Sequence, residues 1–117
     1  MSRPHSVGKN LTANTLTTMF TVPTRNMAKW TLLYAYNGTS SAKNFRAFWY
    51  DASENVEVAV VYDYSLTGKN FLRIDGQAYV VLDEHDEIRV LIETGATNAS
   101  CIVTLELEQR STVQQFN

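Results

Sequence analysis

Cysteine, basic residues and long apolar runs are all scarce in this sequence, and each scarcity excludes a class of protein. The only cysteine among 117 residues is Cys101, which excludes an internal disulfide and a zinc site built from several cysteines. Ten lysines and arginines against twelve aspartates and glutamates give a net charge of −2, which argues against a nucleic-acid partner. No apolar run approaches the roughly 18 residues of a membrane-spanning helix, and the N-terminal residues lack the apolar core of a secretory signal. The remaining composition, 44% hydrophobic and 19% charged, is typical of one globular domain.

Helical periodicity is nearly absent as well, and the chain instead alternates runs of β-branched and aromatic residues with turn clusters. About eight strands at this spacing, with no helical pattern between them, predict an all-β fold: an antiparallel, jelly-roll-like β-sandwich. Asp75-Gly76 lies between two of the runs and predicts a tight hairpin. The predicted strands are Leu16–Val22, Ala28–Asn37, Asn44–Tyr50, Val56–Ser65, Phe71–Ile74, Ala78–Leu82, Asp86–Glu93 and Ala99–Glu108.

The alternation of side chains predicts which residues of a strand share a face. In Ala28–Asn37 the even-numbered positions share one face, and in Val56–Ser65 the apolar side chains are in register. In Ala99–Glu108 the stripe that contains Cys101 is apolar and the opposite positions are largely polar. We therefore expect Cys101 to be a small buried apolar group rather than a reactive thiol.

Two polar segments flank the predicted sandwich, which covers residues 15–108. Residues 1–14 and residues 109–117 lack strand alternation and are interpreted as N-terminal and C-terminal arms. Such a segment either frays or orders against a neighbouring subunit. In the second case Val113 and Phe116 are the apolar anchors that would dock.

Few residues are candidates for chemistry. The acidic cluster Asp83–Glu87 contains metal-ligand types, but it lacks the oxygen spacing and the glycine of a calcium loop, which favours a solvated turn. His5 and His85 are the only histidines, and neither accompanies a nucleophile motif. We therefore predict no catalytic residue, no metal site and no cofactor.

The aromatic residues are more informative than the titratable ones. In Asn44–Tyr50, Phe45 and Trp49 point one way while Phe48 and Tyr50 point the other, so both faces of this strand are apolar. One face belongs to the core, and the pattern leaves open which. The other is core too, a subunit interface or a carbohydrate platform, since Tyr and Trp supply large contact areas. The candidate interface residues are Phe48, Trp49, Tyr50, Val113 and Phe116.

Two short motifs resemble small β-sandwich virion proteins of tailed bacteriophages. Thr18–Pro23, with the sequence TMFTVP, looks like the T-L-Y-T-V-P opening that leads into a strand ending in an asparagine, here Asn37. Val80–Val90, with the sequence VVLDEHDEIRV, looks like the signature V-V-L-x-x-G-D-x-I-x-V. A closing strand that ends in an acidic residue, here Leu105–Glu108, completes the pattern. The resemblance follows the order of elements over about residues 15–108, and only the two motifs are specific.

The sequence departs from that family at two turn glycines. Thr24-Arg25-Asn26 stands where a glycine usually follows the proline, and His85 stands where a glycine usually precedes the aspartate. Glycine is favoured at such positions because it adopts left-handed backbone conformations freely. The geometry of both turns is therefore affected.

The resemblance implies a bacteriophage virion protein without catalytic residues, either a capsid decoration or a component of the neck or tail. Its expected location is the virion, and its expected partners are other copies of itself and other virion proteins, with no nucleic acid and no membrane. Neither the position in the virion nor the symmetry follows from it. The alternative from the residues alone is a carbohydrate-binding module that uses the surface aromatics Trp49 and Tyr50.

Overall fold

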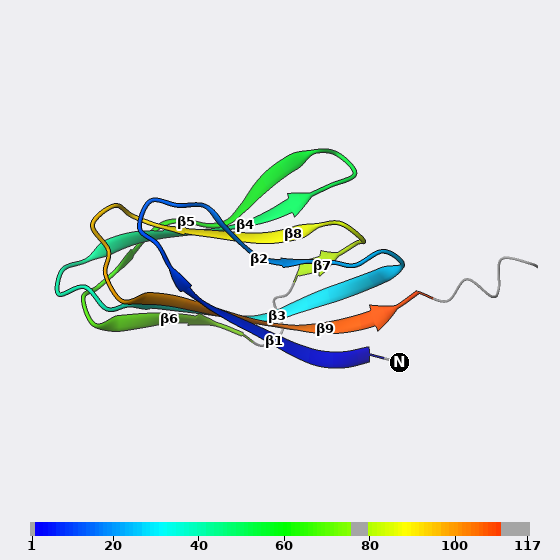
Figure 1. The fold of residues 1–117 in the computed structure, drawn as a ribbon, viewed down its shortest axis with the longest axis horizontal. Helices are drawn as coiled ribbons and strands as arrows, with labels where there is room; N and C mark the ends of the chain where they lie inside the picture. Colours follow the sequence, from blue (N-terminus) through cyan, green and yellow to red (C-terminus); the bar gives the residue numbers. More distant parts are fainter. Residues whose placement is uncertain (1, 76–79, 111–117) are drawn as a thin grey trace, which may run out of the picture.

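The described part of the chain forms nine β-strands in two layers (Figure 1). The computed structural model describes residues 2–75 and 80–110. The short loops between the strands agree with the predicted turn clusters, and most strand ends lie within two residues of the predicted ones. The strands are β1 (Ser2–Leu11), β2 (Thr17–Thr21), β3 (Asn26–Asn37), β4 (Lys43–Asp51), β5 (Val56–Leu66), β6 (Asn70–Ile74), β7 (Val80–Leu82), β8 (Glu87–Ile92) and β9 (Ala99–Gln109).

The strands form two antiparallel sheets. Sheet A has the order β1-β9-β3-β6, with β7 also paired to β3, and sheet B has the order β2-β8-β4-β5. If β6 and β7 are counted as one interrupted strand, the eight strands have the orders 1-8-3-6 and 2-7-4-5. This order is the two-sheet jelly roll. The predicted all-β sandwich of the jelly-roll type is therefore confirmed.

The hairpin predicted at Asp75-Gly76 is wrong. β6 pairs with Leu33–Asn37 and β7 pairs with Ala28–Trp30, both antiparallel to β3 and on the same edge of it. The two segments therefore run in the same direction and do not form a hairpin with each other. β3 is 12 residues long, and its edge offers backbone hydrogen-bond partners to both segments. A hairpin would pair the two short segments only with each other and would leave the edge of β3 unpaired.

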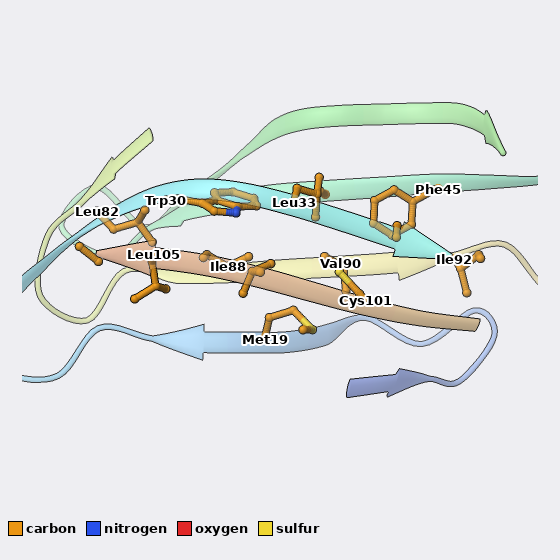
Figure 2. Packing of buried hydrophobic residues seen from close by; sticks show 14 of the residues in the cluster. Met19, Trp30, Leu33, Phe45, Leu82, Ile88, Val90, Ile92, Cys101 and Leu105 are labelled. Carbon is orange, nitrogen blue, oxygen red and sulfur yellow. The ribbon is translucent and has the colours of Figure 1, made fainter. Parts of the chain in front are cut away.

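The core lies between the sheets and is built from alternate positions of each strand (Figure 2). On β8 the inward side chains are Ile88, Val90 and Ile92, which are at most 1% exposed. On β9 the predicted apolar stripe, which contains Cys101, is buried in the same way. On β4, Phe45 is 0% exposed, so the face that carries Phe45 is the core face. The sequence pattern had left open which of the two faces of this strand belongs to the core.

A bulge in β3 changes which of its residues face the core. Trp30 pairs with Leu105 and Leu32 pairs with Thr104, so Thr31 is an extra residue in the ladder. The buried positions are therefore even-numbered up to Trp30 and odd-numbered afterwards, beginning with Leu33. The prediction that all even positions share a face is wrong beyond the bulge. As a result, the tyrosines of the second half of β3 lie on the outer face of sheet A.

The segment predicted as an N-terminal arm is a strand for most of its length. β1 pairs with β9 from Ser2 opposite Glu108 to Leu11 opposite Ala99. Backbone hydrogen bonding to the free edge of β9 does not require apolar alternation, which is why the sequence pattern missed it. At the C-terminus, β9 continues through Gln109. Residues 111–117, including the predicted anchors Val113 and Phe116, lie outside the described residues.

The turns after β2 and before β8 each contain a non-glycine residue in a conformation that glycine favours. Arg25 has φ of 66° and His85 has φ of 71°, both in the left-handed region. A backbone hydrogen bond joins the two turns, because the amide of His85 donates to the carbonyl of Val22 at 2.8 Å. Both residues therefore adopt this backbone conformation at a cost in strain.

Candidate functional site

The residues predicted as the few candidates for chemistry have structural roles. His5 on β1 packs its ring 5.6 Å from the ring of Phe20, and His85 makes a side-chain hydrogen bond of 3.0 Å to Thr24. In the segment Asp83–Glu87, the first four residues form the turn between β7 and β8, and Glu87 begins β8. Within residues 2–75 and 80–110, no three His, Cys, Asp or Glu side chains lie close enough to hold a metal ion. In the same residues there is no helix with the length and apolarity to cross a membrane.

Cys101 is fully buried on the inner face of β9. Burial raises the pKa of its thiol from 9.0 to about 12, since the thiolate would be formed away from water. The thiol therefore stays protonated at neutral pH. This environment is that of a packing residue and not of a nucleophile.

Asp86 is the buried charged side chain of the described chain, with 2% exposure. Its Oδ2 accepts hydrogen bonds from the indole Nε1 of Trp49 at 3.0 Å and from the amide of Asp83 at 2.9 Å. Its Oδ1 accepts from the amide of Ala52 at 3.0 Å. The carboxylate thus joins β4, the turn after β4 and the turn before β8. All these partners come from the fold, so Asp86 is a structural crosslink.

The three predicted interface residues on β4 do not share a face. Trp49 points inward, packs against the core and is held by Asp86. Phe48 and Tyr50 lie on the outer face of sheet B and are half-buried. This arrangement is the one that the alternation of the sequence predicts, with Phe45 and Trp49 on one face of β4 and Phe48 and Tyr50 on the other.

A charged network covers the outer face of sheet B around Tyr50. The guanidinium of Arg89 lies 3.9 Å from the centre of the Tyr50 ring and binds Glu87 at 2.8 Å and Glu57 at 3.2 Å. The hydrogen bond to Glu87 is the main cause that raises the pKa of Arg89. Because a cation–π contact covers one side of the ring, Tyr50 does not present a free aromatic platform.

An exposed set of apolar side chains lies on another strand, β5, at the end of sheet B. Five large apolar side chains of β5 are solvent-exposed, and β6 adds two more. We call these residues the β5–β6 edge surface. Its members, with their exposed fractions, are Val56 (48%), Val58 (40%), Val60 (41%), Tyr62 (61%), Tyr64 (47%), Phe71 (52%) and Ile74 (36%). The prediction that those of β5 are in register is wrong beyond Ala59, because the pairing with β4 shifts twice and the Tyr62 ring lies 4.3 Å from the guanidinium of Arg46 on the outer face.

This surface is exposed because the two sheets do not match in length at this side. β5 has 11 residues, whereas β6, the last strand of sheet A, has 5. The β4–β5 hairpin, green in Figure 1, stands away from the rest of the sandwich. Below it, Val60, Ile74 and Trp30 line a groove between the sheets. The sequence signal was present, since β5 carries apolar residues at most positions, but the pattern does not show whether they face the core or the solvent.

The outer face of sheet A carries a smaller aromatic patch beside this edge. The rings of Tyr34 and Phe71 are stacked with centres 5.2 Å apart and an interplanar angle of 17°. Ile102, which is 39% exposed, is the cross-strand neighbour of Tyr34. Because Phe71 belongs to both patches, apolar groups continue around β6 from one sheet face to the open edge.

Comparison with known proteins gives a likeness of fold. No family model matches the chain, and no curated protein sequence matches it. The chain is similar to a chain of the T13 viral particle of infectious bursal disease virus, with a TM-score of 0.52 and 8% identity. The match covers 95% of this chain and 36% of the other, so this chain spans about a third of the protein that it matches. A chain of the Gx strain of the same virus gives a TM-score of 0.47 at 10% identity, with 95% and 36% covered. The first of these likenesses shows that the protein has the jelly-roll fold of a viral particle domain.

Proposed function

We propose that this protein is a structural subunit of a virus particle that packs against copies of itself and other particle proteins and catalyses no reaction. The observation that carries the proposal is the jelly-roll strand order, which aligns over 95% of the chain with a viral particle protein at a TM-score of 0.52. The fold alone also occurs in lectins, so the surface must support the assignment.

The distribution of apolar side chains supports an assembling protein. Seven large apolar side chains of β5 and β6 are exposed, and exposed apolar patches mark contacts with other proteins. Among the described residues, the histidines, Cys101 and Asp86 are all engaged in the fold, which leaves no constellation suited to catalysis.

We further propose that the particle is that of a tailed bacteriophage, in which this subunit decorates the capsid or forms part of the neck or tail. The support is that the two motifs of the resemblance meet in space. Val22 of the first motif donates its amide to the carbonyl of Asp86 in the second at 2.9 Å, and accepts from the amide of His85 at 2.8 Å. Two motifs more than 60 positions apart therefore form one structural unit.

The alternative of a carbohydrate-binding module has less support. It needs flat aromatic rings open to solvent, and the two residues expected to supply them are Trp49 and Tyr50. Trp49 is turned inward onto Asp86, and Arg89 covers the Tyr50 ring. We therefore favour the particle subunit.

The test is to band virus particles from the source of the chain on a caesium chloride gradient and to quantify the chain by mass spectrometry in the band and in the soluble fraction. An abundant soluble host protein is the control for carry-over. Enrichment in the band through a high-salt wash supports the proposal, and gold-labelled antibody then distinguishes capsid from neck or tail. A chain found only in the soluble fraction overturns it.

A further inference from the structure

We infer that a second copy of this chain adds to the free edge of β5, paired antiparallel about a two-fold axis at Val58. The inference rests on the proposed function and names the partner and the contact through which subunits meet. In the resulting dimer, sheet B of one copy continues into sheet B of the other, with four strands from each.

The first argument is that part of β5 is an unprotected sheet edge. Within the described chain β5 pairs only with β4, so one row of its backbone donors and acceptors is unpaired. Such a row is a template for another strand unless the edge is blunted. From Val56 to Ala59 the pairing with β4 is regular, opposite Asp51 to Phe48.

The second half of β5 is blunted by the devices that edge strands use. The register with β4 shifts twice, between Phe45 and Ala47 and between Ala47 and Phe48. Asp63 lies in the first of these bulges with φ of 53° and forms an ion pair of 2.6 Å with Arg46. Bulges and charges disfavour strand addition. A partner strand is therefore directed to the half that begins at Val56.

The second argument is the chemistry of that half. Val56, Val58 and Val60 are 48%, 40% and 41% exposed. Val56 and Val58 lie in the regular ladder opposite Asp51 and Trp49. Val60, at the register shift where this half ends, lines the groove beside Ile74. The one ionisable side chain between them is Glu57, which is bound to Arg89 at 3.2 Å on the outer face. A partner strand thus meets valines and no unpaired charge.

The third argument is that the segment is complementary to itself. A two-fold axis at Val58 places Val58 opposite its own copy, Val56 opposite Val60, and Glu57 opposite Ala59. The valine pairs are apolar cross-strand pairs, and no like charges are opposed. An axis at Val60 would instead set Glu57 opposite Asp63, two carboxylates. The charges therefore disfavour the register centred on Val60 and permit the one centred on Val58.

The area indicates how tightly the copies bind. If about 150 Å² is taken for a valine side chain, the exposed parts of Val56, Val58 and Val60 sum to roughly 200 Å² per copy. Two copies would bury about 400 Å² of apolar side chain, which is well below the range of stable complexes. We therefore expect a weak dimer in solution, with Kd near 10⁻⁴ M, of the kind that gains strength when many contacts form together.

The experiment is sedimentation equilibrium over about 10 µM to 1 mM, the range that brackets this Kd. Wild-type protein is expected to shift from monomer to dimer as concentration rises. In a dimer of either Val58→Lys or Val58→Glu, two like charges would face each other on the axis. The dissociation constant of the dimer should therefore rise at least tenfold. An equal mixture of the two variants should recover a dimer, because the opposed charges are then complementary. Val81→Lys is the matched control: Val81 is 48% exposed on β7, outside the contact, and should behave as wild type.

A disulfide crosslink tests the same contact if a charged variant fails to fold, which circular dichroism would show. Directly opposed strand residues have Cα atoms about 4.5–5.5 Å apart, within disulfide range. Val58→Cys should therefore crosslink into dimers on mild oxidation, and Val81→Cys should not. The buried native Cys101 does not compete.

The outcomes separate this inference from the proposed function. A wild-type monomer at every concentration, together with no crosslinking of Val58→Cys above the Val81→Cys level, overturns the β5 contact even if the chain bands with particles. Dimerisation that Val58→Lys leaves unchanged also overturns it. Specific dimers of a chain that never bands with particles support the contact and overturn the particle proposal instead.

Discussion

Replacement of Asp86 by alanine should cost more stability than replacement of any surface carboxylate. The side chain is 2% exposed and accepts hydrogen bonds from Trp49, Ala52 and Asp83 at 2.9–3.0 Å. A hydrogen bond to a charged group contributes about 1.5–3 kcal/mol net, and each donor left without a partner costs about 1–3 kcal/mol when buried. Water can reach part of this site through the groove lined by Trp49, Asp83 and Asp86, which offsets part of the loss.

We therefore expect Asp86→Ala to lower the free energy of unfolding by about 3–5 kcal/mol. Asp86→Asn keeps one acceptor oxygen and should lose about 2 kcal/mol, because its amide group faces a backbone or indole donor. Since a small domain has only about 5–15 kcal/mol in total, the alanine variant should be close to unfolding. Its melting temperature should fall by roughly 15 °C.

The measurement is urea unfolding followed by tryptophan fluorescence and circular dichroism, with a double-mutant cycle that combines Asp86→Asn with Trp49→Phe. The matched control is Asp75→Ala, since Asp75 forms an exposed ion pair with Arg73 at 2.6 Å and should change stability by less than about 0.5 kcal/mol. If Asp86→Ala loses no more than the control, the three hydrogen bonds do not hold the β4 and β8 turns together and the reasoning is refuted.

Three further predictions concern the thiol and the turns. Burial raises the pKa of Cys101 from 9.0 to about 12, so folding favours the protonated thiol and stability is lost as pH rises above 9. Between pH 8 and pH 10.5 wild type should lose about 2 kcal/mol more than Cys101→Ala, and a native thiol that reacts readily with Ellman's reagent at pH 8 would contradict the burial. At His85, whose φ is 71°, the glycine variant should be about 1 kcal/mol more stable than the alanine variant in urea unfolding, and equal stabilities would show that the turn is not strained. A Cβ on Gly68 would lie 2.4 Å from the carbonyl oxygen of Ser40, so Gly68→Ala should lower the melting temperature by the equivalent of about 1–3 kcal/mol, and an unchanged melting temperature would show that this loop yields freely.

The fold class could be predicted from this sequence because nearly every strand carries its own signal. β8 and β9 carry apolar residues at every inward position, and turn residues mark their ends. β1 carries no such signal. It exists because β9 would otherwise have a free edge, and that is a property of the assembled sheet. The Asp75-Gly76 hairpin failed for the same reason, since β3 and not the adjacent segment supplied the partner.

The candidate surface was harder to predict than the fold because single inserted residues decide which side chains face the core. Thr31 is an extra residue in β3, and it turns Leu33 inward and leaves Tyr34 to stack with Phe71 on the outer face. No alternation pattern reveals such an insertion, because a shift of one residue exchanges the faces of everything that follows.

The bulges of β5 have a different consequence, which concerns selectivity of contact. Two register shifts, together with Asp63 at a positive φ, disrupt the half of the edge that follows Ala59, while the valines before it remain regular. A strand that were exposed along all of its 11 residues would accept partners in many registers and would promote aggregation. Restricting the regular edge to one short segment reduces the number of registers in which a partner strand can pair. The irregularities of β5 therefore favour one defined contact, such as the proposed pairing with a second copy of the chain.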